Sequence, residues 1–232
     1  MPEPVIDTTS LDAIRSLYFV PGTNADGIKA GLHSGAHAVC ADVEDLVPAE
    51  DKDDARRTIR DQFGSAEPGG PLLLVRINPP DNVDAYRADT QLVAELPLAG
   101  VVLPLASPQS VREVAALGRP IVAMVETAAG VRAGFEIAQD PAVARMMLGP
   151  GDLGKQMELD VRGEPDALLF IRSSLVVDCA AAGRQAPFDT PGTGEEDEFR
   201  RTVRYGRALG FRGKLCFSPA QVAIVNEEYA GS

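Results

Sequence analysis

Three polar residues each end or follow an apolar run in the middle of the chain, and their types suit metal-assisted chemistry. Glu126 closes the run IVAMV, Asp152 follows MMLGPG, and Arg76 closes LLLV. Two carboxylates at the ends of neighbouring buried strands can bind one hard cation. A guanidinium at the same level can bind an anionic oxygen through two parallel hydrogen bonds. The pattern therefore predicts catalytic roles for Arg76, Glu126 and Asp152, with Glu126 and Asp152 as the metal ligands.

Other acids follow the apolar runs at equivalent places, and they strengthen the prediction of a cation. These are Asp42, Glu44, Asp45 and Asp189. Like charges in a low-dielectric pocket raise one another's pKa, and a divalent metal relieves that repulsion. Oxygen ligands without His or Cys among them favour Mg²⁺ over Zn²⁺.

Each of these features also has a purely structural interpretation. The acids that follow the second run can cap a helix or bind loop amides. The Gly-Pro-Gly before Asp152 can form an ordinary tight turn, and Arg76 can belong to a structural ion pair.

Apolar runs that read as strands alternate with helical patterns through most of the chain. The expected strands cover residues 16–21, 38–45, 72–78, 100–105, 121–127, 144–148, 185–189 and 213–217. The expected helices cover residues 24–34, 49–63, 84–96, 107–117, 131–139, 166–182 and 195–209. Continuously apolar runs are typical of parallel strands that are buried on both faces.

Eight strand–helix units in roughly 200–250 residues are typical of a TIM barrel, a (β/α)8 fold that carries its active site at the carboxyl ends of its strands. A doubly wound sheet is the alternative, but the chain has no G-x-G-x-x-G after its first run and no G-x-x-x-x-G-K motif. We therefore predict a single α/β barrel domain over residues 15–232, preceded by a flexible tail over residues 1–14.

Composition limits the classes of partner. A formal net charge of −12 argues against nucleic acid as a partner. No apolar stretch reaches the roughly 20 residues of a membrane span, and the first residues lack the features of a signal peptide. Three scattered cysteines fit buried free thiols in a reducing cytoplasm.

Several ordered motifs resemble the citrate lyase beta-subunit-like proteins, which belong to the HpcH/HpaI family of 2-oxo acid aldolases and CoA-ester lyases. The motifs are RSLYFVPG from Arg15, ADVEDLVP from Ala41, VRIN from Val75, MVETAAG from Met124, LGPGDL from Leu148 and ALGFRGK from Ala208. The resemblance covers nearly the whole chain from Arg15 onward.

The resemblance implies a TIM barrel that forms homotrimers or hexamers and uses Mg²⁺ to make or break a C–C bond in citryl, malyl or citramalyl thioesters. It implies that Glu126 and Asp152 bind Mg²⁺ and that Glu126 also contacts the substrate. It implies further that Arg76 clamps a substrate carboxylate or the thioester carbonyl.

Weaker implications concern Glu44 and Asp45, which would hold metal-bound water, and Arg15, which would contact the CoA part of the substrate. A free 2-oxo acid aldolase, an acyl-CoA thioesterase with the same metal site and a non-catalytic barrel subunit are the alternatives.

The chain departs from the family pattern at several places. Leu105 stands where the family has Lys, Ser218 stands where it has His, and a glycine-rich segment follows Asp189. The sequence ends at Ser232, as expected for a short form without the C-terminal arm of longer relatives. Without that arm, we expect a more open site.

Overall fold

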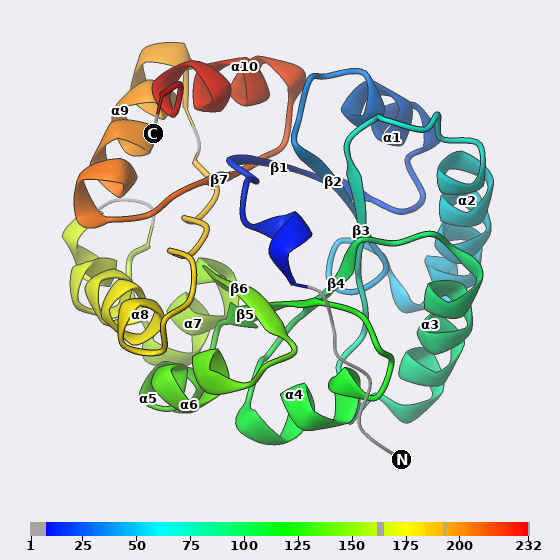
Figure 1. Ribbon diagram of the computed structural model, residues 1–232, viewed down its shortest axis with the longest axis horizontal. Coiled ribbons are helices and arrows are strands. Elements are labelled where there is room, and N and C mark those ends of the chain that lie inside the picture. Colours follow the sequence, from blue (N-terminus) through cyan, green and yellow to red (C-terminus); the bar gives the residue numbers. More distant parts are fainter. Residues whose placement is uncertain (1–7, 162–164, 193, 232) are drawn as a thin grey trace.

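The computed structural model describes residues 8–161, 165–192 and 194–231, and its centre is one parallel sheet. The strand order is β6-β5-β4-β3-β2-β1-β7, and the sheet curls so that the strands surround an interior (Figure 1). The strands are β1 (Ser16–Pro21), β2 (Ala38–Asp42), β3 (Leu72–Arg76), β4 (Gly100–Leu103), β5 (Ile121–Val125), β6 (Val143–Leu148) and β7 (Lys214–Cys216).

Helices follow the strands and form an outer layer around them (Figure 1). They are α1 (Ala25–Leu32), α2 (Lys52–Gly64), α3 (Val83–Glu95), α4 (Pro108–Ala115), α5 (Ala128–Arg132), α6 (Gly134–Gln139), α7 (Pro150–Met157), α8 (Leu169–Ala181), α9 (Glu196–Leu209) and α10 (Pro219–Glu228). Short 3-10 turns cover Thr9–Leu11, Ala49–Asp51 and Pro165–Leu168. The alternation of strands and helices confirms the predicted α/β class.

The prediction of eight strands is wrong in one place, because the described residues form a seven-stranded sheet. The expected strand at 185–189 makes only two isolated parallel bridges, Met147↔Phe188 toward β6 and Asp189↔Lys214 toward β7. This segment therefore lies between the two edge strands without extending the ladder. Pro187 lies within it and Pro191 follows it, and proline has no N–H to donate to a neighbouring strand.

Both faces of the strands are buried, which explains their continuously apolar sequences. Along β1, Leu17 and Phe19 face the interior that the strands enclose, whereas Tyr18 and Val20 pack in the layer beneath the helices. The inner cluster contains residues from all seven strands and from the segment around Phe188.

Residues 1–7 of the predicted flexible tail over residues 1–14 lie outside the part of the chain that the structure describes. Residues 8–14 belong to the folded part of the chain. Leu11 and Ile14 are buried in the inner cluster. The guanidinium of Arg145 donates to the carbonyl oxygens of Leu11, Asp12 and Ile14 at 3.3, 3.3 and 3.4 Å. Figure 1 shows this short turn inside the ring of strands. Apolar side chains and a buried cation hold it there.

Within the described residues, no helix is both long enough and apolar enough to cross a membrane. Cys40, Cys179 and Cys216 are free and buried.

The burial of Leu11 leads to a testable prediction about stability. Leu11→Ala should lower the free energy of unfolding by about 2–5 kcal/mol, because it leaves a cavity in the inner core. Val83→Ala, at a side chain exposed at the start of α3, should change it by less than about 0.5 kcal/mol. Chemical denaturation measures both values. Equal stabilities for Leu11→Ala and the unmodified protein would show that the segment is a tail.

Candidate functional site

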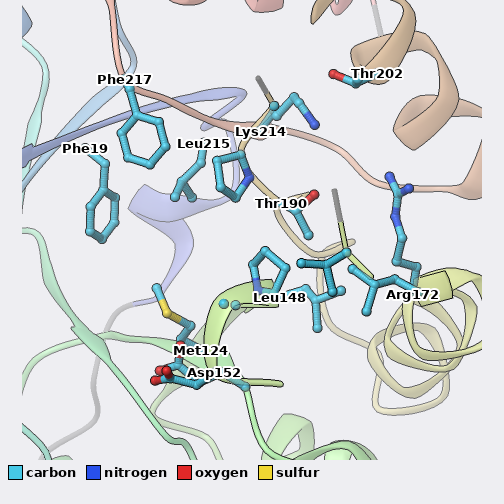
Figure 2. A pocket seen from close by; sticks show the side chains of 18 of the residues that line it. Phe19, Met124, Leu148, Asp152, Arg172, Thr190, Thr202, Lys214, Leu215 and Phe217 are labelled. Atoms are coloured by element: carbon cyan, nitrogen blue, oxygen red, sulfur yellow. The ribbon is translucent and has the colours of Figure 1, made fainter. Parts of the chain in front are cut away.

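A cavity of about 840 Å³ opens at the carboxyl ends of the strands, and the predicted residues Arg76, Glu126, Asp152 and Asp45 line it. Figure 2 shows this cavity, with Asp152 among the side chains that line it. The opposite end of the ring is filled by Leu11 and Ile14. The cavity therefore lies where a barrel of this kind presents its catalytic groups.

The firmest contact in the site joins the last residues of two neighbouring strands. Asp42 ends β2, Arg76 ends β3, and the strand register places them opposite each other. Nε and Nη2 of Arg76 donate to the two carboxylate oxygens of Asp42 at 2.6 and 2.7 Å. The same oxygens accept from the backbone N–H groups of Glu44 and Leu46 at 2.9 and 2.7 Å. Asp42 thus fixes both the guanidinium and the loop that follows β2.

The remaining edge of the guanidinium is turned toward the cavity. Nη1 of Arg76 lies 3.1 Å from a carboxylate oxygen of Glu44 and 4.0 Å from the sulfur of Met124. The guanidinium carbon lies 5.3 Å from the centre of the Phe19 ring. Burial opposes the charge, but the hydrogen bonds and charge of Asp42 outweigh it and raise the pKa of Arg76. Arg76 is therefore a permanent, rigidly held cation.

Glu126 follows β5 and is 6% exposed. One of its carboxylate oxygens accepts from the backbone N–H of Leu105 at 2.8 Å. Leu105 has a φ of 48°, a left-handed conformation that costs energy for a residue with a branched side chain. The strained turn after β4 therefore presents its N–H to the carboxylate.

Burial raises the pKa of Glu126 to about 7. The N–H of Leu105 and the charge of Arg76 oppose this rise, whereas Glu44 and Asp152 add to it. Glu126 is thus a buried carboxylate with too little positive charge around it, which is the environment that a bound cation would satisfy.

Gly149 sets the position of Glu126 by close approach. A Cβ atom at Gly149 would lie 2.4 Å from a carboxylate oxygen of Glu126 and 2.9 Å from its Cβ atom. A Cβ at Gly151 would meet nothing within 4 Å. Of the two glycines in the Gly-Pro-Gly segment, only Gly149 lacks space for a side chain.

Asp152 lies in the first turn of α7, so the Gly-Pro-Gly segment starts a helix and is not the tight turn of the structural alternative. Pro150 is in its first turn, where a missing N–H costs nothing. The Asp152 side chain is 39% exposed, and its Oδ1 accepts from Nζ of Lys155 at 2.8 Å.

Glu126 and Asp152 fit a Mg²⁺ ion by the chemistry of their donors. Both offer carboxylate oxygens, and the raised pKa of Glu126 shows a shortage of positive charge. Among the described residues, no group of three or more His, Cys, Asp or Glu side chains is arranged to hold a metal. The protein would therefore supply two ligands and leave the other positions to water or substrate, as is usual for Mg²⁺.

The other predicted residues separate into different places. Glu44 pairs with Arg76, and Asp45 lines the cavity. Arg15 does not line it: this residue precedes β1, at the amino ends of the strands, and donates to the carbonyl oxygens of Asp12 and Ile14. Asp189 is separate from the other acids and pairs with two cations. A position after an apolar run therefore does not predict a place among the other acids when, as for Asp189, the run forms no regular strand.

Several cavity residues were missed by the sequence reasoning. Lys155 could have been found from its i, i+3 spacing to Asp152 on a helix, had the helix been predicted. Met124 and Phe19 lie inside apolar runs and carry no separate signal. Arg172 and Lys214 come from α8 and β7, and only the tertiary fold brings them together. Ser218, which replaces the expected His, caps α10 through Gln221.

The pKa of Glu126 predicts how stability depends on pH without metal. The ordinary value is 4.5 and the folded value is about 7, so the folded state holds its proton more tightly. Raising the pH from about 5 to about 8 should destabilise the unmodified protein relative to Glu126→Gln by up to about 3 kcal/mol. Urea denaturation of both proteins in EDTA measures the difference. A difference that stays constant with pH would contradict the assigned environment.

Comparisons with known proteins support the same chemistry. Residues 15–219 match the family model described as HpcH/HpaI aldolase/citrate lyase. A (3S)-malyl-CoA thioesterase of Cereibacter sphaeroides is 32% identical over 225 residues, which cover 94% of this chain and 78% of that protein. A citrate lyase subunit beta-like protein of Deinococcus radiodurans is 34% identical over 228 residues, covering 93% and 80%.

Solved structures show the same fold. A citrate lyase beta subunit from Mycobacterium tuberculosis, complexed with oxaloacetate and magnesium, superposes with a TM-score of 0.82 at 26% identity, covering 95% of this chain and 99% of that one. A second structure from that organism holds magnesium, acetoacetate and coenzyme A, with a TM-score of 0.82 at 27% identity, covering 96% and 83%. By family match, relatives and fold, this chain belongs to the HpcH/HpaI aldolase/citrate lyase family.

Proposed function

We propose that the protein is a Mg²⁺-dependent carbon–carbon lyase that cleaves a short hydroxyacyl-CoA or related thioester such as citryl-, malyl- or citramalyl-CoA. The observation that carries the proposal is one cavity in which Glu126 and Asp152 offer oxygen ligands beside an Arg76 that Asp42 holds in place. The relatives named for malyl-CoA and the structure with oxaloacetate and magnesium support this choice of chemistry.

We propose a role for each residue of the site. Glu126 and Asp152 would hold Mg²⁺, which would supply Lewis acidity toward the oxygens of the departing 2-oxo acid. Glu126 would also contact that acid. Arg76 would point Nη1 at the thioester oxygen and stabilise the negative charge that develops when the C–C bond breaks. Glu44 and Asp45 would orient water at the metal site.

Rigidity matters for these roles. Oriented cations stabilise a transition state best when they need no rearrangement during the reaction. The double hydrogen bond to Asp42 removes the freedom of the Arg76 side chain. Exchange of Arg76 for Lys would lose this paired geometry.

Hydrolysis of the same thioester is the second candidate. It is favoured by the thioesterase name of a relative that shares 32% identity across 94% of this chain. In that reaction water would attack the thioester carbonyl, and the C–C bond would stay intact. An aldolase for free 2-oxo acids and a non-catalytic barrel would show neither product.

A substrate panel separates these possibilities. Malyl-, citramalyl- and citryl-CoA should be cleaved with Mg²⁺ and not in EDTA, and Glu126→Gln should lose the activity. A lyase releases a 2-oxo acid and an acyl-CoA, whereas a thioesterase releases CoA with a free thiol. Chromatography of the CoA species and a thiol reagent distinguish the two. Condensation of pyruvate with aldehydes, without any thioester cleavage, would overturn the proposal.

The close approach of Gly149 to Glu126 provides a test of the metal site that needs no substrate. Gly149→Ala should displace the Glu126 carboxylate and weaken Mg²⁺ binding roughly 10–100-fold. Gly151→Ala is the matched control, because its new methyl group meets open space. Calorimetric titration with Mg²⁺ gives both affinities. Equal affinities for the two variants would contradict a metal position on Glu126.

Assembly and location remain predictions. We propose a homotrimer or hexamer in the cytoplasm. The side chains of Phe170 and Val177 on α8 are 70% and 64% exposed, and such apolar exposure suits an interface between subunits. The three free thiols suit a reducing compartment.

A further inference from the structure

A second charged group lies on the wall of the same cavity, and the proposed reaction does not use it. Arg172 from α8 donates through Nη2 to both carboxylate oxygens of Asp189, at 2.8 and 2.6 Å. Nζ of Lys214 donates to Oδ2 of the same carboxylate at 3.0 Å. We call these three residues, Arg172, Lys214 and Asp189, the basic cluster. It contains two cations and one anion, so its net charge is +1.

The basic cluster is buried, which makes its surplus charge costly. The side chains of Arg172, Lys214 and Asp189 are only 8%, 1% and 1% exposed. A buried charge needs a partner of opposite sign, because desolvation costs several kcal/mol per ion. The rings of Tyr205 and Phe211 lie 4.8 and 5.4 Å from the guanidinium carbon of Arg172 and compensate only in part.

Arg172 and Lys214 also have N–H groups that their contacts with Asp189 do not use. Arg172 uses one nitrogen for Asp189, and within the described part of the chain its Nε has no hydrogen-bond partner. An ammonium has three N–H bonds, and the contact from Lys214 to Asp189 uses one of them. Buried donors without partners are rare in folded proteins and indicate an absent acceptor.

An acceptor from solvent can reach these donors through the cavity. Arg172 and Lys214 both line it, together with the hydroxyl-bearing Thr190, Thr202 and Tyr205. Figure 2 shows Arg172, Lys214 and Thr202 at the end of the pocket away from Asp152 and Met124. Arg201 and Glu198, which carry opposite charges, also line the cavity.

We propose that the basic cluster is an anion subsite, which binds a carboxylate or phosphate group of the substrate at the end of the cavity away from Glu126 and Asp152. The inference deepens the proposed function, because it gives the ligand two polar ends: one at the metal site and one at the basic cluster. Planar carboxylates and phosphates both suit the parallel donors of an Arg side chain.

The test uses metal-free protein in EDTA without turnover, so its outcome is independent of the lyase proposal. Inorganic phosphate and acetate are titrated by calorimetry and followed by the shift in melting temperature. At least one of these anions should bind to and stabilise the unmodified protein. Arg172→Met should weaken that binding by at least about tenfold. Arg201→Met, at an exposed arginine on the same cavity, should bind as the unmodified protein does.

Folding does not obscure the test. Arg172→Met leaves a neutral Lys214–Asp189 pair, and Lys214→Met leaves a neutral Arg172–Asp189 pair. If one variant fails to fold, the other should still lose the anion response. Absence of any anion response in the unmodified protein, or an unchanged response in the variant that folds, would overturn the proposal and show a purely structural ion cluster.

Two matched pairs of ligands identify the source of the anion. CoA and pantetheine differ in their phosphates, and malate and lactate differ by one carboxylate. A preference for CoA that Arg172→Met removes would assign the subsite to the carrier, and a preference for malate that it removes would assign it to the acyl group. If neither preference depends on Arg172, the subsite is not part of substrate binding and the proposal fails.

Discussion

The double hydrogen bond between Asp42 and Arg76 is the contact on which the site depends. It joins the carboxyl ends of β2 and β3 at one register position. Asp42 uses its remaining acceptor capacity on the backbone of Glu44 and Leu46. One buried carboxylate therefore determines where the arginine points and how the acidic loop after β2 runs. Without Asp42, Arg76 would be a buried cation with only the partly exposed Glu44 beside it.

The cavity has an acidic end and a basic end. The carboxyl groups of Glu126 and Asp152 lie at one end. Burial raises the pKa of Glu126, and the charge of Asp152 adds to that rise. At the other end, Arg172 and Lys214 both form ion pairs with Asp189. At each end the neighbouring opposite charges balance the buried charge only in part, and a divalent cation at one end and an anionic group at the other would complete the balance. Polar groups held in this unfavourable state by the surrounding fold are typical of binding sites.

Much of the fold and part of the site could be predicted from local sequence, because strands buried on both faces leave a continuous apolar signal. The limits of β1 match the prediction, and Glu126 and Asp152 meet in one cavity because both follow neighbouring strands. The strand at 185–189 was predicted wrongly, since Pro187 within it and Pro191 after it limit strand pairing there. The basic cluster was also beyond sequence reasoning. Its members come from α8, β7 and an irregular segment, and no spacing rule relates them.

We propose above all that Glu126 and Asp152 bind one divalent cation beside Arg76. A crystal structure with Mn²⁺ and oxaloacetate tests it directly, because the anomalous signal locates the metal without reference to the expected site. We predict one ion bound to carboxylate oxygens of both Glu126 and Asp152. Lys155 should be displaced from Asp152, and the Asp42–Arg76 contact should be unchanged. An ion bound elsewhere, or a cavity without an ion while Lys155 remains on Asp152, would contradict it.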